Sequence, residues 1–156
     1  MEWVVATQQE ILIRGQLSGL HPFLSAREDW ERTLNTLRDL LAQQAFDVIH
    51  FYGTGCTQQQ GCNIVRAHLL AIWPGCQDVV VESDLVAAAR SCWHTEAGVV
   101  CILGSGSNVA YYDGEKIKEQ RGGLGYVLGD EGAGADLGKI LLAAHLNGDL
   151  PSDLSA

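Results

Sequence analysis

The amino-acid sequence predicts an α/β fold with a largely parallel sheet. Short apolar segments typical of buried strands alternate with segments whose apolar residues recur at helical spacing. The chain has 156 residues, 47% of them hydrophobic and 19% charged, which suits one domain with a sizeable core. Ten of its 18 glycines lie between Gly104 and Gly138, which indicates a backbone that approaches a ligand closely.

The first half of the chain carries the clearest alternation. Strands are expected at 3–6, 11–16, 48–52 and 79–81, with the first two paired as a hairpin. Ser25 and Glu28 form the pattern of a capping box, which predicts a helix start. Helices are expected from that box to about residue 45, through 64–73, and from 84 to about 93.

The second half begins with a strand and then changes character. A strand at 98–103 is expected to end at Gly104. Strands at 108–112 and 115–118 are expected to form a hairpin around the two-residue turn Asp113-Gly114. A last helix is predicted from near Glu131 to about Asn147.

Charge and cysteine usage exclude several classes of partner. Nineteen acidic against ten basic residues give a net charge of −9, which argues against nucleic acid but not against a nucleotide held by backbone amides. No apolar run is long enough to span a bilayer, and the first residues lack a signal peptide, so we expect a cytoplasmic protein without a membrane partner. The five cysteines have no zinc-site spacing, so reduced thiols and no metal ligands are expected.

Gly104-Ser105-Gly106-Ser107 is the first candidate site. It follows a buried strand, and its glycines and hydroxyls leave several donors that could hold a phosphate. It lacks the lysine of a Walker loop, and a hairpin follows it where a dinucleotide fingerprint requires a helix. A tight turn without a ligand is the alternative interpretation.

Two carboxylates are further candidates. Asp130, beside Glu131, lies between glycines near a predicted helix start, where either a ligand contact or a helix cap is expected. Asp84 follows a strand and begins a helix, so it could accept a proton from a substrate hydroxyl or simply favour the helix dipole. Another strand ends at Gly53-Thr54-Gly55-Cys56, which is either a plain turn or a wall of the substrate site. His21 is the one histidine that falls in a predicted loop.

Several motifs together resemble the N-acetylglucosamine kinase family and the related BadF/BadG/BcrA/BcrD-type ATPases. They are Gly104-Ser105-Gly106-Ser107-Asn108, the Gly-Gly-Leu-Gly stretch at 122–125, Leu128-Gly129-Asp130-Glu131-Gly132, and Ser83-Asp84-Leu85 before three alanines. Both families belong to the superfamily of sugar kinases, actin and heat-shock chaperone ATPases. The resemblance implies a ribonuclease-H-like (actin-type ATPase) lobe, whose mixed central sheet has helices on both faces.

The same resemblance implies ATP-dependent phosphoryl transfer to a hydroxyl of N-acetylglucosamine or a related hexose, with Mg²⁺ as the metal that accompanies ATP. Asp84 would be the general base. The implied phosphate-binding residues are Gly104, Ser105, Gly106 and Ser107. The implied sugar-binding residues are His21, Asp84, Gly123, Leu124 and Asp130.

The family pattern also implies how the chain is organised. Its first phosphate loop would precede Met1 and its adenosine-binding lobe would follow Ala156, so residues 1–156 are expected to be a single N-terminal lobe without its first strand. Such a chain is expected to be inactive alone. A non-catalytic sugar-binding or interaction fragment and a BadF-type ATPase that activates a dehydratase stay open as alternatives, as does a homodimer.

Overall fold

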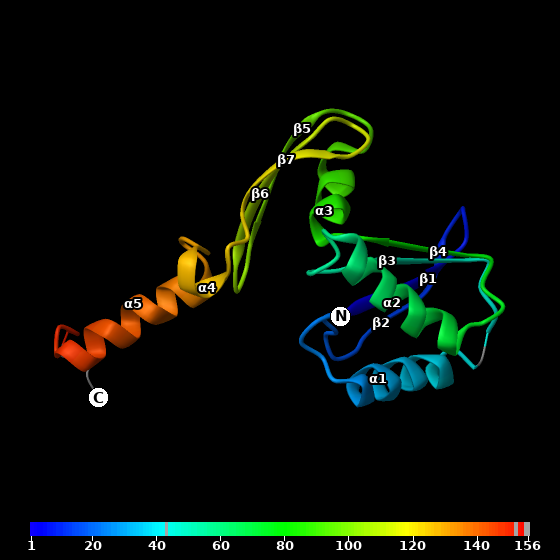
Figure 1. Ribbon diagram of the computed structural model, residues 1–156, viewed down its shortest axis with the longest axis horizontal. Coiled ribbons are helices and arrows are strands. Elements are labelled where there is room, and N and C mark those ends of the chain that lie inside the picture. The colour runs from blue at the N-terminus through cyan, green and yellow to red at the C-terminus, as the bar shows by residue number, and fades with distance from the viewer. Residues whose placement is uncertain (43, 152, 155–156) are drawn as a thin grey trace. The chain divides into compact units, whose positions relative to one another are not determined.

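The computed structural model describes residues 1–42, 44–151 and 153–154 as two compact units, Met1–Asp84 and Leu85–Ala156 (Figure 1). Both units contain helices and strands, so the predicted α/β class is confirmed. The expectation of a single lobe stays a prediction. In the described part of the chain, no helix is both long enough and apolar enough to cross a membrane.

The first unit contains a hairpin, a parallel strand pair and two helices. Its elements are β1 (Glu2–Ala6), β2 (Ile11–Gln16), α1 (Arg27–Leu40), β3 (Val48–Tyr52), α2 (Gln59–Ile72) and β4 (Asp78–Glu82). β1 pairs antiparallel with β2, as the alternating pattern predicted. β3 pairs parallel with β4, with Tyr52 opposite Glu82, because the α2 crossover returns the chain in the same direction.

The core of this unit lies between the helices and the parallel strands, and α2 is the layer between α1 and the β3–β4 pair in Figure 1. Its buried members include Trp30 and Leu34 of α1, Val65 and Leu69 of α2, and Val79 of β4, whereas β3 contributes half-buried side chains. Trp30 stacks on His68 with ring centroids 4.7 Å apart. Desolvation beside this core lowers the pKa of His68, so the unprotonated ring is favoured there.

The start and the end of α1 differ from the sequence prediction. The capping box was wrong: Ala26 is at the N-cap position and no side chain caps the helix. The Ser25 hydroxyl instead accepts a hydrogen bond from the His21 amide at 2.9 Å, because it closes the preceding turn. The helix ends at Leu40 and not near Ala45.

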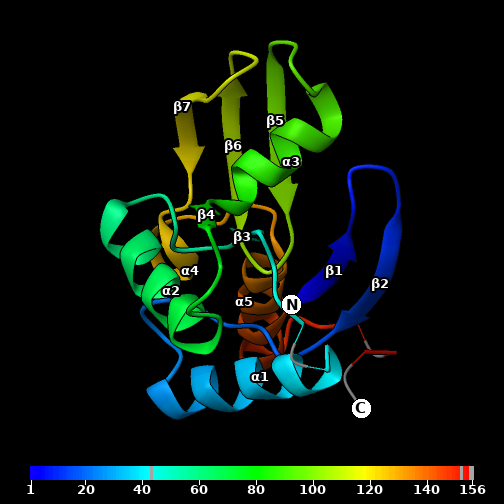
Figure 2. The same ribbon diagram turned by 90° about the vertical axis from the view of Figure 1, so that its right-hand side faces the viewer.

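The second unit is built around three antiparallel strands. Its elements are α3 (Asp84–Trp93), which begins at the last residue of the first unit, β5 (Gly98–Leu103), β6 (Ser107–Tyr112), β7 (Ile117–Gly122), α4 (Gly125–Leu128) and α5 (Gly134–Asn147). Figure 2 shows β5, β6 and β7 side by side with α3 along them. Leu85 and Ala89 of α3 are buried against Val100, Ala110 and Tyr112 of the sheet.

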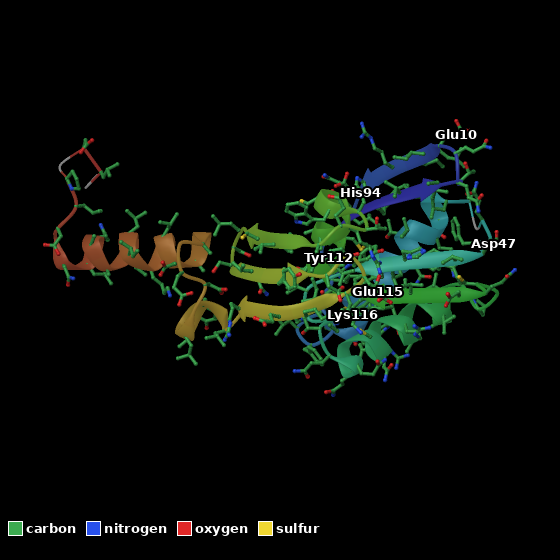
Figure 3. All side chains as sticks on the ribbon, turned by 90° about the horizontal axis from the view of Figure 1, so that it is seen from above. Glu10, Asp47, His94, Tyr112, Glu115 and Lys116 are labelled. Atoms are coloured by element: carbon green, nitrogen blue, oxygen red, sulfur yellow. The ribbon has the colours of Figure 1, made fainter. Side chains whose placement is uncertain are left out.

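Tyr112 joins this core to the loop that follows α3. Its side chain is almost fully buried, and its hydroxyl lies 3.2 Å from the His94 carbonyl oxygen (Figure 3). The Gly114 carbonyl oxygen lies 3.0 Å from the same hydroxyl. A buried tyrosine thus finds the polar partners that its hydroxyl requires.

The hairpin turn and the last helix also differ from expectation. The turn after Tyr112 spans four residues, because the Asp113 carboxylate accepts hydrogen bonds from the amides of Glu115 and Lys116 at 3.0 and 2.8 Å. The returning strand therefore starts at Ile117. The last helix starts at Gly134, three residues after the predicted Glu131.

The described strands form three sheets, where a single mixed central sheet was expected. Each strand pairs with a neighbour in the sequence. Leu103 and Ser107 are separated by only three residues, so β5 and β6 turn back on each other as an antiparallel pair. The periodicity of a strand does not specify which partner it has, so the single mixed central sheet stays a prediction.

Candidate functional site

The carboxyl ends of β3 and β4 form the first candidate region. The two strands are parallel and in register, so the residues that follow them emerge at the same edge. The Gly53 amide donates a hydrogen bond to the Glu82 carbonyl oxygen at 3.1 Å, which extends the pairing by one residue. Ligands bind at such edges in open α/β sheets.

Thr54 and Asp84 meet at this edge. The Thr54 hydroxyl donates a hydrogen bond to Asp84 Oδ2 at 2.8 Å, although the two residues lie 30 positions apart. Asp84 is half-buried at the first turn of α3, and Thr54 is exposed in the turn after β3. The carboxylate therefore faces solvent in part while a neighbouring strand end holds it, as a general base requires.

His21 lies against the same turn. Gly55 has φ +85°, and a Cβ placed on it would be 3.0 Å from His21 Nε2 and 2.9 Å from Pro22 Cγ. His21 Nδ1 accepts a hydrogen bond from the Phe23 amide at 3.2 Å, so in the neutral ring the proton is on Nε2. The predicted sugar-binding histidine thus packs one residue away from Thr54.

Two cysteines and a glycine lie in or beside this turn: Cys56 in the turn itself, and Gly61 and Cys62 in the first turn of α2. Burial, together with the nearby Cys62 and Asp84, raises the pKa of Cys56 to about 11, so this thiol stays protonated at neutral pH. The Cys62 thiol donates to the Cys56 carbonyl oxygen at 3.3 Å. A Cβ on Gly61 would lie 2.1 Å from the Gly55 carbonyl oxygen, so only glycine lets α2 approach the turn this closely.

The turn between β5 and β6 forms the second candidate region, in the second unit. The Gly104 amide donates to the Gly106 carbonyl oxygen at 2.9 Å and closes the turn. The first residues of α5 reach back to it, because the amides of Gly134 and Ala135 donate to the carbonyl oxygens of Gly104 and Ser105 at 2.8 and 3.1 Å. These bonds fix the shape of the predicted phosphate-binding turn.

Asp130 is held against this turn. Its Oδ1 accepts a hydrogen bond from the Ser107 amide at 3.0 Å, and a Cβ on Gly106 would lie 2.9 Å from the same oxygen. Asp130 is 8% exposed and has φ +62°, which aspartate tolerates better than most residues. It is not the cap of α5, whose N-cap is Ala133.

The donors that remain on the turn suit a phosphate group. Asp130 and Gly106 already accept from the amides of Ser107 and Gly104. Within the described residues, the amides of Ser105 and Gly106 donate to no protein group, and the Ser105 side chain is exposed. Adjacent backbone amides of this kind can hold phosphate oxygens.

Gly123 and Leu124 lie next to the same turn. The Gly123 amide donates to the Ser107 carbonyl oxygen at 3.1 Å, and Gly123 has φ +69°. A Cβ there would lie 2.9 Å from Asn108 Nδ2, so a side chain would collide with β6. Leu124 is 67% exposed, which leaves its side chain available to a ligand.

The predicted site residues thus fall into two groups. His21 and Asp84 belong to the first unit, whereas Gly104 to Ser107, Gly123, Leu124 and Asp130 belong to the second. Sequence reasoning placed Thr54 in a plain turn or a substrate wall and gave no role to Gly61, which precedes the predicted helix segment 64–73. Only the three-dimensional structure identifies the partner of Thr54 and the close approach at Gly61.

No family model and no curated protein matches the chain. Among solved structures, a protein of Porphyromonas gingivalis described as "Putative N-acetylglucosamine Kinase" matches with a TM-score of 0.89 and 35% identity over 99% of the chain. A Chromobacterium violaceum protein of the same description matches with a TM-score of 0.57 and 23% identity over 82% of the chain, which shows likeness of fold alone. The chain spans 55% and 47% of their lengths. The predicted resemblance to the N-acetylglucosamine kinase family is therefore confirmed, because the chain is similar in sequence and fold to about half of a protein with that description.

Proposed function

We propose that this chain provides the general base and a phosphate-binding turn of an ATP-dependent kinase for N-acetylglucosamine or a related hexose. The observation that carries this proposal is the 35% identity over 99% of the chain to a structure described as such a kinase. We also propose that the chain has the ribonuclease-H-like, actin-type ATPase fold.

In this proposal Asp84 takes the proton of the sugar hydroxyl as the hydroxyl oxygen attacks the γ-phosphorus of ATP. The bond between that phosphorus and the bridging oxygen breaks, and its electron pair leaves with ADP. The half-buried Asp84 carboxylate at the common edge of β3 and β4 supports this role. His21, Gly123, Leu124 and Asp130 would contact the sugar.

The amides of Ser105 and Gly106, with the hydroxyls of Ser105 and Ser107, would hold phosphate oxygens of ATP. Their geometry supports this use, because the amides have no other acceptor among the described residues. Mg²⁺ would be bound mainly by the phosphates, as is usual for kinases. It would neutralise charge that develops during transfer.

The experiment is a sugar-dependent ADP assay on the protein expressed from its native gene, with a panel of amino sugars and neutral hexoses. We expect turnover of about 1–100 s⁻¹ with the preferred sugar. Calorimetry with each sugar separates binding from turnover. Sugar binding without ADP formation would favour the non-catalytic module, and a panel without binding or turnover would refute the proposal.

A further inference from the structure

Thr54 is a polar side chain that bonds the proposed base, and it comes from a different strand end. Its hydroxyl donates to Asp84 Oδ2 at 2.8 Å. A helix-start carboxylate needs no such partner, because the amides of its own helix favour its charge. The contact from β3 therefore fixes the carboxylate relative to the strand edge and not only relative to α3.

The backbone around Thr54 is built to keep this hydroxyl in place. The Gly53 amide is bonded to the Glu82 carbonyl oxygen, two residues before Asp84. On the other side, Gly55 is packed against His21 and its carbonyl oxygen against Gly61. Thr54 is thus held between two anchored glycines, and its β-branched side chain has few rotamers to choose from.

We infer that Thr54 is the positioning residue of the Asp84 base, which it orients through the hydroxyl bond. This inference rests on the proposed kinase function. A charge-assisted hydrogen bond is short and directional, so it selects one orientation of the carboxylate among several rotamers.

The test compares Thr54→Val and Thr54→Ser in the protein expressed from its native gene, with Thr57→Val as the matched control. Valine keeps the β-branched shape without the hydroxyl, and serine keeps the hydroxyl. Thr57 is exposed on the same segment, and its side chain makes no hydrogen bond to the described residues. Melting curves establish that each variant is folded.

We expect Thr54→Val to lower kcat by about 10- to 100-fold with little change in the sugar KM. Thr54→Ser should recover most of the activity, and Thr57→Val should match the wild type.

The experiment distinguishes failure of the proposed function from failure of the inference about Thr54. A wild-type protein without sugar-dependent ADP formation overturns the proposed function, and the inference with it. An active wild type whose Thr54→Val variant keeps its kcat overturns the inference alone. A loss of kcat that Thr54→Ser does not recover also contradicts it, because the hydroxyl is then not the important group.

Discussion

Asp84 and Asp130 are two predicted site carboxylates in very different surroundings. Asp84 is half-buried, and a side-chain hydroxyl from the neighbouring strand end bonds it. Asp130 is 8% exposed, has φ +62°, and accepts from the backbone amide of Ser107. The surroundings of Asp84 hold the proposed base in place. Asp130, in contrast, helps to shape the β5–β6 turn that it contacts.

This difference shows that a carboxylate to which family resemblance gives a ligand-binding role can also support the local structure. Removing the Asp84 charge leaves the strand pairing around it intact, since that pairing is made by backbone groups. Removing the Asp130 carboxylate leaves the Ser107 amide, at the β5–β6 turn, without its partner. Substitutions should therefore separate chemistry from folding in the first region and change both together in the second.

The largest effect is expected for Asp84→Asn. Without a base, kcat should fall by roughly 10²–10⁴-fold, while the melting temperature should change little. A matched control is Asp78→Asn, at the exposed start of β4, the strand that precedes Asp84, and it should leave kcat unchanged. Steady-state kinetics and a melting curve on each variant test both statements. An active Asp84→Asn enzyme would return Asp84 to a helix-start role.

Asp130→Ala should reduce both stability and ligand binding. We expect a loss of about 1–3 kcal/mol in the free energy of unfolding, because the Ser107 amide loses its acceptor. Sugar affinity and nucleotide affinity should then fall together. Asp130→Asn keeps an oxygen acceptor and tolerates the same backbone conformation, so it should keep the stability while it removes the charge.

Denaturant unfolding and calorimetry with sugar and with nucleotide measure these effects separately. If Asp130→Ala keeps its stability and loses only sugar affinity, Asp130 is a sugar contact and not a support of the turn.

Gly106→Ala should have a smaller effect of the same kind. The added Cβ would lie 2.9 Å from Asp130 Oδ1, so the side chain or the turn must shift, at about 1–3 kcal/mol for overpacking. Gly104→Ala is the matched control in the same turn, since a Cβ there meets nothing within 4 Å. Equal stabilities of the two variants would show that the Asp130 contact does not constrain the turn.

The smallest effect is expected at a half-buried carboxylate, Asp113. Hydrogen bonds from the amides of Lys116 and Glu115, and from Lys118, hold its pKa well below the usual value. Its contribution to stability is therefore fully present above the unfolded pKa of about 3.9 and is lost as the pH falls through the lower folded value. Asp113→Asn should remove part of this acid dependence.

Amide hydrogen exchange in the β6–β7 turn, measured from pH 5 downward in both proteins, tests this local effect. Identical profiles for the wild type and Asp113→Asn would contradict it.

Local patterns specified much of the fold. The hairpin of β1 and β2, the bounds of β3 and β5, and the start of α3 at Asp84 follow from periodicity and strand composition. The predictions that failed concern side chains that could form a hydrogen bond with either of two nearby backbone groups. Ser25 could cap a helix or close a turn, and only the conformation at His21 decided this.

The site residues divide in the same way. The sequence by itself determined that Asp84 stands at a strand-to-helix junction and that Gly104 to Ser107 form a turn after a strand, because both depend on neighbours along the chain. Only the tertiary structure decided that Thr54 holds Asp84, 30 positions away, and that Asp130 holds Ser107, 23 positions away. Contacts of this kind depend on strand register and on how closely backbones approach, as Gly61 shows against the Gly55 carbonyl oxygen. The periodicity of a single segment specifies neither the strand register nor the distance between backbones.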